Sequence, residues 1–118
     1  MRYLLLIYGD QATYGQMSEA DLQADMQAWA DYTNELEAAN VSQGGAALQP
    51  VSTATSVRRE NGQPLVSDGP FAETKEQLGG FYILDVPDVD AAIEWANKCP
   101  GVEYGTIELR PVMEFPDA

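Results

Sequence analysis

Two short stretches of the sequence are apolar on both of their alternating faces, and a helical pattern follows each of them. Residues 2–8 place Tyr3, Leu5 and Ile7 on one face and Leu4, Leu6 and Tyr8 on the other. Residues 81–86 place Phe81 and Ile83 on one face and Tyr82, Leu84 and Val86 on the other. Strands that are apolar on both faces lie in the middle of a sheet and are covered on both sides. We therefore predict two central strands, around which the other elements are arranged.

A helix-capping signal follows the first central strand. Ser18 is the predicted N-cap, with Asp21 three residues later as a variant of the capping box. Apolar residues then recur at helical spacing as far as about Asn40 and predict an amphipathic helix. The predicted inner stripe of this helix consists of Leu22, Met26, Trp29, Ala30, Thr33 and Leu36.

A second helix follows the second central strand. Asp88 is its predicted cap, and Pro100-Gly101 ends it. Its predicted inner stripe consists of Val89, Ala92, Ile93 and Ala96. A last strand is predicted over residues 106–110, with Ile107 and Leu109 facing inward.

A polar hairpin is predicted between the two strand–helix units. Residues 46–49 form a short strand that ends at Pro50, and residues 53–59 and 65–67 are the two arms on either side of Asn61-Gly62. Asn-Gly is a strong signal for a two-residue hairpin turn. Because the arms are polar and alternate only weakly, we expect them at the margin of the sheet.

The order strand, helix, hairpin, strand, helix, strand predicts one α+β domain over residues 1–118, with a ferredoxin-like βαββαβ plan and an extra hairpin. Both helices then cover the same face of the sheet, and the apolar side chains on the other face lack a cover. Such a patch marks an interaction site in soluble proteins. We expect a homodimer that packs sheet on sheet, with pockets between sheet and partner.

Composition excludes several classes of function. The formal net charge is −13, so the chain has no basic footprint for nucleic acid or for an anionic membrane surface. It has one cysteine, Cys99, and no histidine. The absence of histidine excludes histidine-dependent nucleophilic triads and most transition-metal sites. We expect an acidic cytoplasmic protein, without a membrane segment, a metal or a cofactor, that draws any acid/base chemistry from Asp, Glu, Tyr or Lys.

The segment from Asp68 to Glu76, DGPFAETKE, holds the candidate catalytic residues. Asp68 is a candidate general base, and Lys75 is a candidate for stabilising an anion. Phe71, Glu73 and Glu76 are candidate ligand-binding residues, on a loop (68–80) longer than a simple connection needs. The alternative is a structured loop in which Pro70 opens a short helical turn, Phe71 fills the core and the charged residues face water.

Three further residues are candidates for ligand binding. Tyr8 and Asp10 lie at the end of a central strand, where pockets often open. Arg110 faces outward on the last strand and could hold an anion. The alternatives are a core tyrosine, a turn aspartate and a surface or dimer ion pair.

The segment DGPFAETKE, continued by QLGGFY to Tyr82, resembles the YCII-related family and specifically its DGPF subgroup. Supporting segments are YLLLIYGD at residues 3–10, Gly44-Gly45 with LQP at 48–50, and ELRPVME at 108–114. The resemblance covers essentially the whole chain. It implies a dimeric α/β barrel built from ferredoxin-like subunits.

The resemblance implies less about activity. Some YCII-related proteins pair a histidine with an aspartate, a pair that this chain cannot form because it has no histidine. One distant member resembles a dehydrochlorinase that acts on a chlorinated hydroxyquinol. Members of the DGPF subgroup are often encoded beside extracytoplasmic-function sigma factors, which suggests a regulatory setting.

Three hypotheses of function remain open from the sequence. The first is a homodimer that binds a small ligand or regulates a partner. The second is a cofactor-free lyase or isomerase with Asp68 as general base and Lys75 or Arg110 stabilising an enolate-like anion. The third is a structural or interaction dimer, so the sequence does not decide whether the protein is an enzyme.

Overall fold

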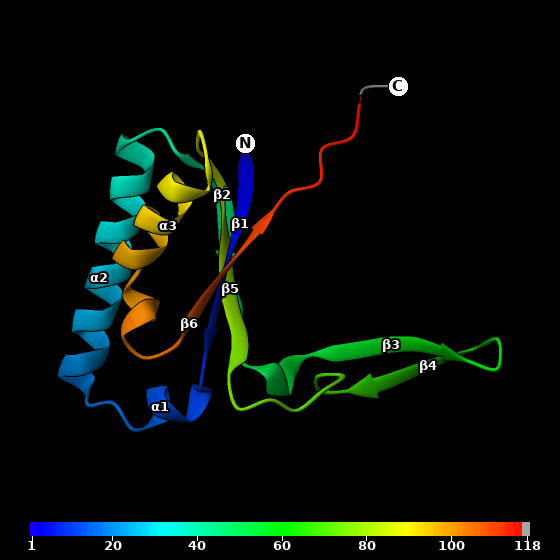
Figure 1. Ribbon diagram of the computed structural model, residues 1–118. Coiled ribbons are helices and arrows are strands. Elements are labelled where there is room, and N and C mark those ends of the chain that lie inside the picture. The colour runs from blue at the N-terminus through cyan, green and yellow to red at the C-terminus, as the bar shows by residue number, and fades with distance from the viewer. Residues whose placement is uncertain (117–118) are drawn as a thin grey trace.

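The computed structural model describes residues 1–116 and has one four-stranded antiparallel sheet (Figure 1). The strand order is β2 (Ser42–Ala47), β5 (Gln77–Asp85), β1 (Arg2–Gly9) and β6 (Thr106–Pro111). Helices α2 (Glu19–Ala38) and α3 (Val89–Lys98) cover the same face of this sheet (Figure 1). The arrangement is α+β and consistent with the predicted ferredoxin-like plan.

Three shorter elements and a hairpin complete the described chain. Helix α1 (Gln11–Gly15) follows β1, and the 3-10 turns η1 (Val51–Thr53) and η2 (Pro100–Glu103) follow β2 and α3. Strands β3 (Thr55–Glu60) and β4 (Gln63–Asp68) form a separate two-stranded ribbon. None of the helices within residues 1–116 is long and apolar enough to cross a membrane.

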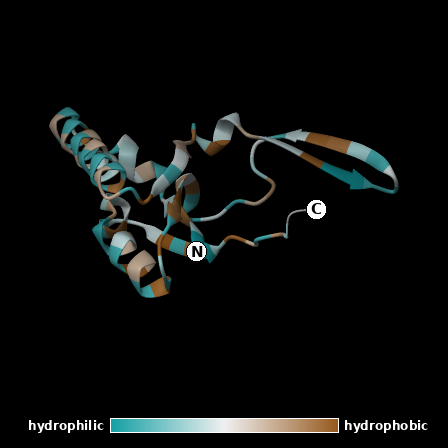
Figure 2. Ribbon diagram, turned by 90° about the horizontal axis from the view of Figure 1, so that it is seen from above, coloured by the Kyte–Doolittle hydropathy of each residue, from teal (hydrophilic) through white to brown (hydrophobic). Residues whose placement is uncertain are grey.

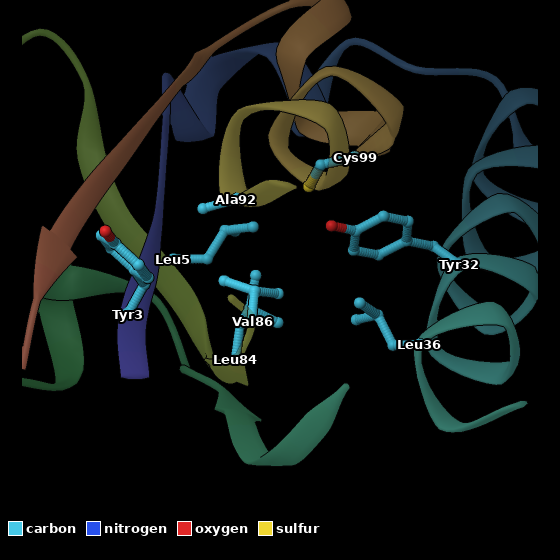
Figure 3. Packing of buried hydrophobic residues seen from close by; sticks show 8 residues of the cluster. All are labelled: Tyr3, Leu5, Tyr32, Leu36, Leu84, Val86, Ala92 and Cys99. Carbon is cyan, nitrogen blue, oxygen red and sulfur yellow. The ribbon is translucent and has the colours of Figure 1, made fainter. Parts of the chain in front are cut away.

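The core lies between the sheet and the two helices (Figure 3). Its sheet side is formed by Tyr3, Leu5, Leu84 and Val86, all at most 4% exposed. Ile107 and Leu109 pack against the same cluster. The predicted division of residues 2–8 and 81–86 into two alternating faces is therefore confirmed, as is the predicted inward position of Ile107 and Leu109.

The predicted inner stripe of α2 is partly wrong. Ser18 caps the helix as predicted, accepting a hydrogen bond of 3.1 Å from the Asp21 backbone N–H. The buried residues are Tyr32 and Leu36, whereas Met26 is 70% exposed. Since the apolar residues of α2 occupy more than one helical face, spacing alone did not show which face meets the sheet.

The predicted stripe of α3 is also partly wrong. Asp88 caps the helix through the Ala91 N–H at 2.9 Å, and Ala92 is fully buried. Val89 and Ile93 are 48% and 45% exposed, while Trp95 packs against the core in their place. The Trp95 ring, rather than the two aliphatic side chains, therefore covers the core from α3.

The hairpin is formed as predicted but lies elsewhere. Asn61 and Gly62 have positive φ values of 51° and 77°, as a tight two-residue turn requires. The ribbon of residues 55–68, hereafter the arm, does not extend the margin of the sheet; it projects from it on the side opposite the helices (Figure 1). With the arm, the Cα radius of gyration is 16.6 Å, above the roughly 13–14 Å of a compact domain of this length.

Candidate functional site

A cavity of about 730 Å³ lies between α2 and the half of the sheet formed by β2 and β5. Residues of α1, the end of β1 and η2 close its sides. Its volume is within the range of small-molecule sites in proteins. The cavity is thus the candidate functional site of the chain.

Small residues of the sheet create this space. Gly45, Ala47 and Gly80 form the part of the sheet that faces α2 across the cavity. A Cβ atom at Gly45 would lie 2.4 Å from the carbonyl oxygen of Phe81, and one at Gly80 would lie 2.9 Å from that of Ala46. Because the strands approach too closely for side chains here, no side chain fills the gap beneath the helix.

An aromatic and polar cluster borders one side of the cavity. The rings of Tyr14 and Tyr104 meet edge to face with centroids 5.9 Å apart, and their hydroxyl oxygens are 3.3 Å apart. The Tyr104 hydroxyl also donates a short hydrogen bond to the carboxylate of Asp25. Burial, followed by the hydrogen bond to Asp25, raises the pKa of Tyr104, so this phenol is neutral at physiological pH.

Two further polar groups border the cavity on α2. The hydroxyl oxygens of Thr33 and Tyr82 are 2.6 Å apart, which joins the helix to β5. Glu37 lines the cavity one turn further along the helix. Apart from Asp25 and Glu37, no lining residue within 1–116 is charged, so the cavity has no cation to hold an anionic ligand.

Two glutamines connect the cavity to the DGPFAETKE segment. The side-chain oxygen of Gln77 accepts a hydrogen bond of 3.1 Å from the Gln11 N–H, and its amide nitrogen donates to the Thr74 carbonyl. The side-chain oxygen of Gln11 accepts one of 3.3 Å from the Val51 N–H. Both glutamines line the cavity, so the segment supports its rim without entering it.

The structure places the predicted catalytic residues away from the cavity. Asp68 is the last residue of β4, paired with Thr55 at the base of the arm, and is exposed. Lys75 is exposed on the loop that returns to β5. Within residues 1–116 neither side chain makes an ion pair, so no carboxylate is paired with Lys75.

The remaining predicted loop residues are also separated from the cavity. Phe71 is 86% exposed and does not fill the core, contrary to the structured-loop alternative, and Glu73 is exposed. Pro70 opens no helical turn, because residues 69–76 form neither helix nor strand. Gly69 adopts a φ of 90°, which favours glycine, and donates a hydrogen bond of 2.7 Å to the Ala54 carbonyl that closes the base of the arm.

Three of the predicted ligand-binding residues come together on the face of the sheet opposite the helices. The Tyr8 hydroxyl donates to Glu108 at 3.3 Å, and the Arg110 guanidinium lies 3.9 Å from the same carboxylate. Glu76 accepts a hydrogen bond of 2.7 Å from Thr106 on this face. Burial, with the neighbouring Glu108 charge, raises the pKa of Tyr8, whose backbone position also borders the cavity.

Asp10 has a structural role in the described chain. Its side chain accepts a hydrogen bond of 3.0 Å from the Ala12 N–H and caps α1. This is the turn aspartate of the alternative interpretation. The helix that it caps carries Tyr14 and Gln11 to the cavity, so Asp10 acts on the site only indirectly.

Apart from Tyr8, the residues predicted from the sequence to bind a ligand do not line the cavity, and those that line it were not predicted as site residues. Asp25, Trp29 and Tyr104 come from α2 and from the turn after η2, which are distant in sequence. In the sequence, Gly44-Gly45 stood out only as a segment that supports the family resemblance, and both glycines form part of the cavity wall.

Comparisons with known proteins give matches over nearly the full length of the chain. A family model for the YCII-related domain matches residues 1–116. An uncharacterised protein of Rhizobium meliloti (strain 1021) is 32% identical over 114 residues, which cover 95% of this chain and 92% of that protein. A solved structure with a similar fold is 5-chloro-2-hydroxyhydroquinone dehydrochlorinase of Burkholderia phenoliruptrix AC1100, in complex with 2,5-dihydroxybenzoquinone. The two structures superpose with a TM-score of 0.51 at 13% sequence identity, over 98% of this chain and 96% of the dehydrochlorinase chain. The chain belongs to the YCII-related family.

Proposed function

We propose that this YCII-related chain is a homodimer whose subunits each bind a small, neutral, hydroxylated aromatic ligand in the cavity beneath α2. One observation carries the proposal: an apolar cavity of about 730 Å³ is bordered by a chain of hydroxyl groups that ends on Asp25. Such a combination of apolar walls and a few convergent polar groups is typical of small-molecule sites.

The chemistry of the lining selects the ligand class. Trp29, Tyr14 and Tyr104 offer aromatic surfaces, and the hydroxyl groups can exchange hydrogen bonds with a phenolic O–H. The two carboxylates and the lack of a lining cation disfavour an anionic ligand. We assign the chain to the DGPF subgroup within the family on the segment from Asp68 to Glu76.

The homodimer is inferred from the open face of the sheet. Leu4 and Leu6 alternate with the buried Tyr3 and Leu5, so they point away from both helices, as does Ile83 on β5. A sheet with one helix layer needs a second cover for such side chains. A second copy, packed sheet on sheet, supplies it symmetrically.

Hydroquinone is a suitable probe because it is neutral and carries two phenolic groups. In a ¹H–¹⁵N spectrum of the protein, hydroquinone should shift the indole N–H signal of Trp29, which lines the cavity, and leave that of Trp95 in place. Tyr104→Phe should weaken binding about 5- to 10-fold, because it removes one hydrogen bond of about 1 kcal/mol. Asp68→Asn is the control and should not change the affinity.

Two outcomes contradict this proposal. If the Trp29 signal does not move at millimolar hydroquinone, the cavity does not take this ligand class. If Asp68→Asn weakens binding as much as Tyr104→Phe, the ligand is held by the arm rather than by the cavity. Loss of stability in both variants, without an effect on binding, favours a structural or interaction dimer.

A cofactor-free lyase is the second candidate, favoured by the fold shared with the dehydrochlorinase. It has two candidate bases, Asp68 as expected from the sequence and Asp25 at the cavity. Chloride release from 5-chloro-2-hydroxyhydroquinone tests this function. Loss of turnover in Asp25→Asn with retained hydroquinone binding identifies the base in the cavity, and loss in Asp68→Asn identifies the one in the arm.

A further inference from the structure

We infer that the arm, residues 55–68, packs against a second copy of this chain and clasps it across the open face of the sheet. The inference rests on the proposed homodimer and adds a second contact surface to it. The arm is therefore inferred to contact the other subunit rather than an unrelated protein.

The arm makes little contact with its own subunit. Every residue from Thr55 to Asp68 is exposed except Ser56. Ser56 belongs to the base, where its hydroxyl donates a hydrogen bond of 2.8 Å to the Gly69 carbonyl. An isolated two-stranded hairpin is marginally stable in water, so an arm of this kind needs a surface to pack on.

The arm carries apolar side chains that lack a cover. Val57 and Val66 face each other across the two strands and are 69% and 63% exposed. Leu65, on the other face of the ribbon, is 42% exposed, and Phe71 beyond the base is 86% exposed. The hydropathy colouring shows hydrophobic bands on the arm far from the body of the molecule (Figure 2). Cross-strand pairs of this kind contribute about 0.2–1 kcal/mol to a sheet, and the exposed valine pair offers further apolar area that a partner can bury.

The direction and length of the arm point to the other subunit. The arm leaves the base of the sheet on the side opposite α2 and α3 (Figure 1). This is the side on which the partner of the proposed sheet-on-sheet dimer packs. A six-residue strand spans about 20 Å, whereas two packed sheets are about 10 Å apart. An arm of this length passes the partner's sheet and reaches the level of its helix layer.

Charge also favours a second copy as the occupant. Residues 55–68 hold Arg58 and Arg59, two of the six basic residues of the chain, and two carboxylates, so the arm is neutral. The rest of the chain therefore carries the whole net charge of −13. Two such bodies repel each other, and a neutral arm that presents arginines to the acidic partner reduces this repulsion.

Substitution of the exposed valine pair tests the inference. In Val57→Ser with Val66→Ser, we expect the dimer dissociation constant from sedimentation velocity to rise about 10-fold or more, because buried apolar area is lost. The matched control is Val89→Ser with Ile93→Ser, which changes two exposed side chains on the helix layer. The control should dissociate like the wild type, and equal effects in the two variants would overturn the inference.

Deletion of the arm separates this inference from the proposed dimer. Ala54 and Gly69 are joined by a backbone hydrogen bond of 2.7 Å, so a short glycine turn can replace residues 55–68 without moving the sheet. Circular dichroism and thermal unfolding verify that the variant folds. A weaker dimer supports the clasp, whereas an unchanged dissociation constant refutes it and leaves the sheet-on-sheet dimer and the ligand proposal standing. A wild-type monomer at micromolar concentration refutes both the clasp and the dimer.

A cross-linking experiment identifies what the arm contacts. Arg59→Cys gives an exposed thiol that a photoreactive maleimide can label, since Cys99 is only 1% exposed. The maleimide-labelled variant, at natural isotope abundance, is mixed with ¹⁵N-labelled wild-type protein. The mixture is left until the subunits have exchanged and is then irradiated. Cross-linked peptides that combine the two isotopes support the clasp, and cross-links found only within one chain contradict it.

Discussion

At the scale of single residues, Tyr32 organises the core more than any residue of the predicted stripes. Its ring lies edge to face against Trp29, Tyr82 and Trp95, at centroid distances of 5.6–6.4 Å. Its hydroxyl donates a hydrogen bond of 2.7 Å to the Trp95 carbonyl, which ties α2 to α3. The phenol therefore combines apolar burial with a satisfied polar group.

Burial of two protonated groups predicts a loss of stability at alkaline pH. Burial raises the pKa of Tyr32, and it raises the pKa of the Cys99 thiol to about 11. The folded state then keeps protons that the unfolded chain releases, so stability is complete below about pH 8.5 and falls as the pH rises through about 11. Urea unfolding at pH 7, 9 and 10.5 should show this decline.

Tyr32→Phe isolates the contribution of the phenol. At pH 7 the variant should lose about 1 kcal/mol of unfolding free energy, because the Trp95 carbonyl loses its partner. Between pH 9 and 10.5 its stability should fall less steeply than that of the wild type, since one of the titrating groups is gone. Parallel pH profiles for the two proteins would show that Tyr32 does not titrate in the unfolding equilibrium.

At the scale of elements, the strands were predicted more accurately than the helices. A strand offers two faces, and alternation in residues 2–8 and 81–86 identified both of them correctly. A helix offers a continuous circumference, and α2 carries apolar residues over a wide part of it. The N-caps of the two helices, Ser18 for α2 and Asp88 for α3, depend only on neighbouring residues and were therefore predictable.

Two substitutions on α2 test the corrected stripe. Leu36→Ala should cost about 2–5 kcal/mol of unfolding free energy, because Leu36 is fully buried and its loss leaves a cavity. Met26→Ala should stay within about 0.5 kcal/mol, since Met26 is 70% exposed. Urea unfolding measures both, and a larger cost for Met26 would restore the stripe predicted from spacing.

At the scale of the whole molecule, two surfaces lack a cover within residues 1–116: the open face of the sheet and the arm. They lie on the same side of the molecule (Figure 1). The Tyr8, Glu108 and Arg110 group is on this side as well, so we expect these three residues at the subunit interface rather than in the ligand cavity. An interface between two copies related by a two-fold axis uses the same patch on both copies, so all these features must lie on one side of the chain.

The open face gives a prediction that is independent of the arm. Leu6→Gln with Ile83→Gln should raise the dimer dissociation constant about 10-fold or more, because polar amides replace buried apolar surface. Sedimentation velocity measures the change, and circular dichroism verifies the fold. Leu22→Gln, on α2 and away from the open face, is the control. An unchanged dimer in the double variant would mean that the sheets do not pack on each other.

The sequence alone determined the features that depend on neighbouring residues. These are the alternation of the central strands, the helix caps, the Asn61-Gly62 turn, the exclusion of histidine chemistry and the family signature. Tertiary structure decided the rest: which face of each helix meets the core, where the arm points, and that Asp25, Gly45 and Tyr104 surround one cavity. The physical reason is that spacing along a chain reports only contacts within a few residues, whereas a cavity forms where side chains from distant segments fail to fill the space between packed layers.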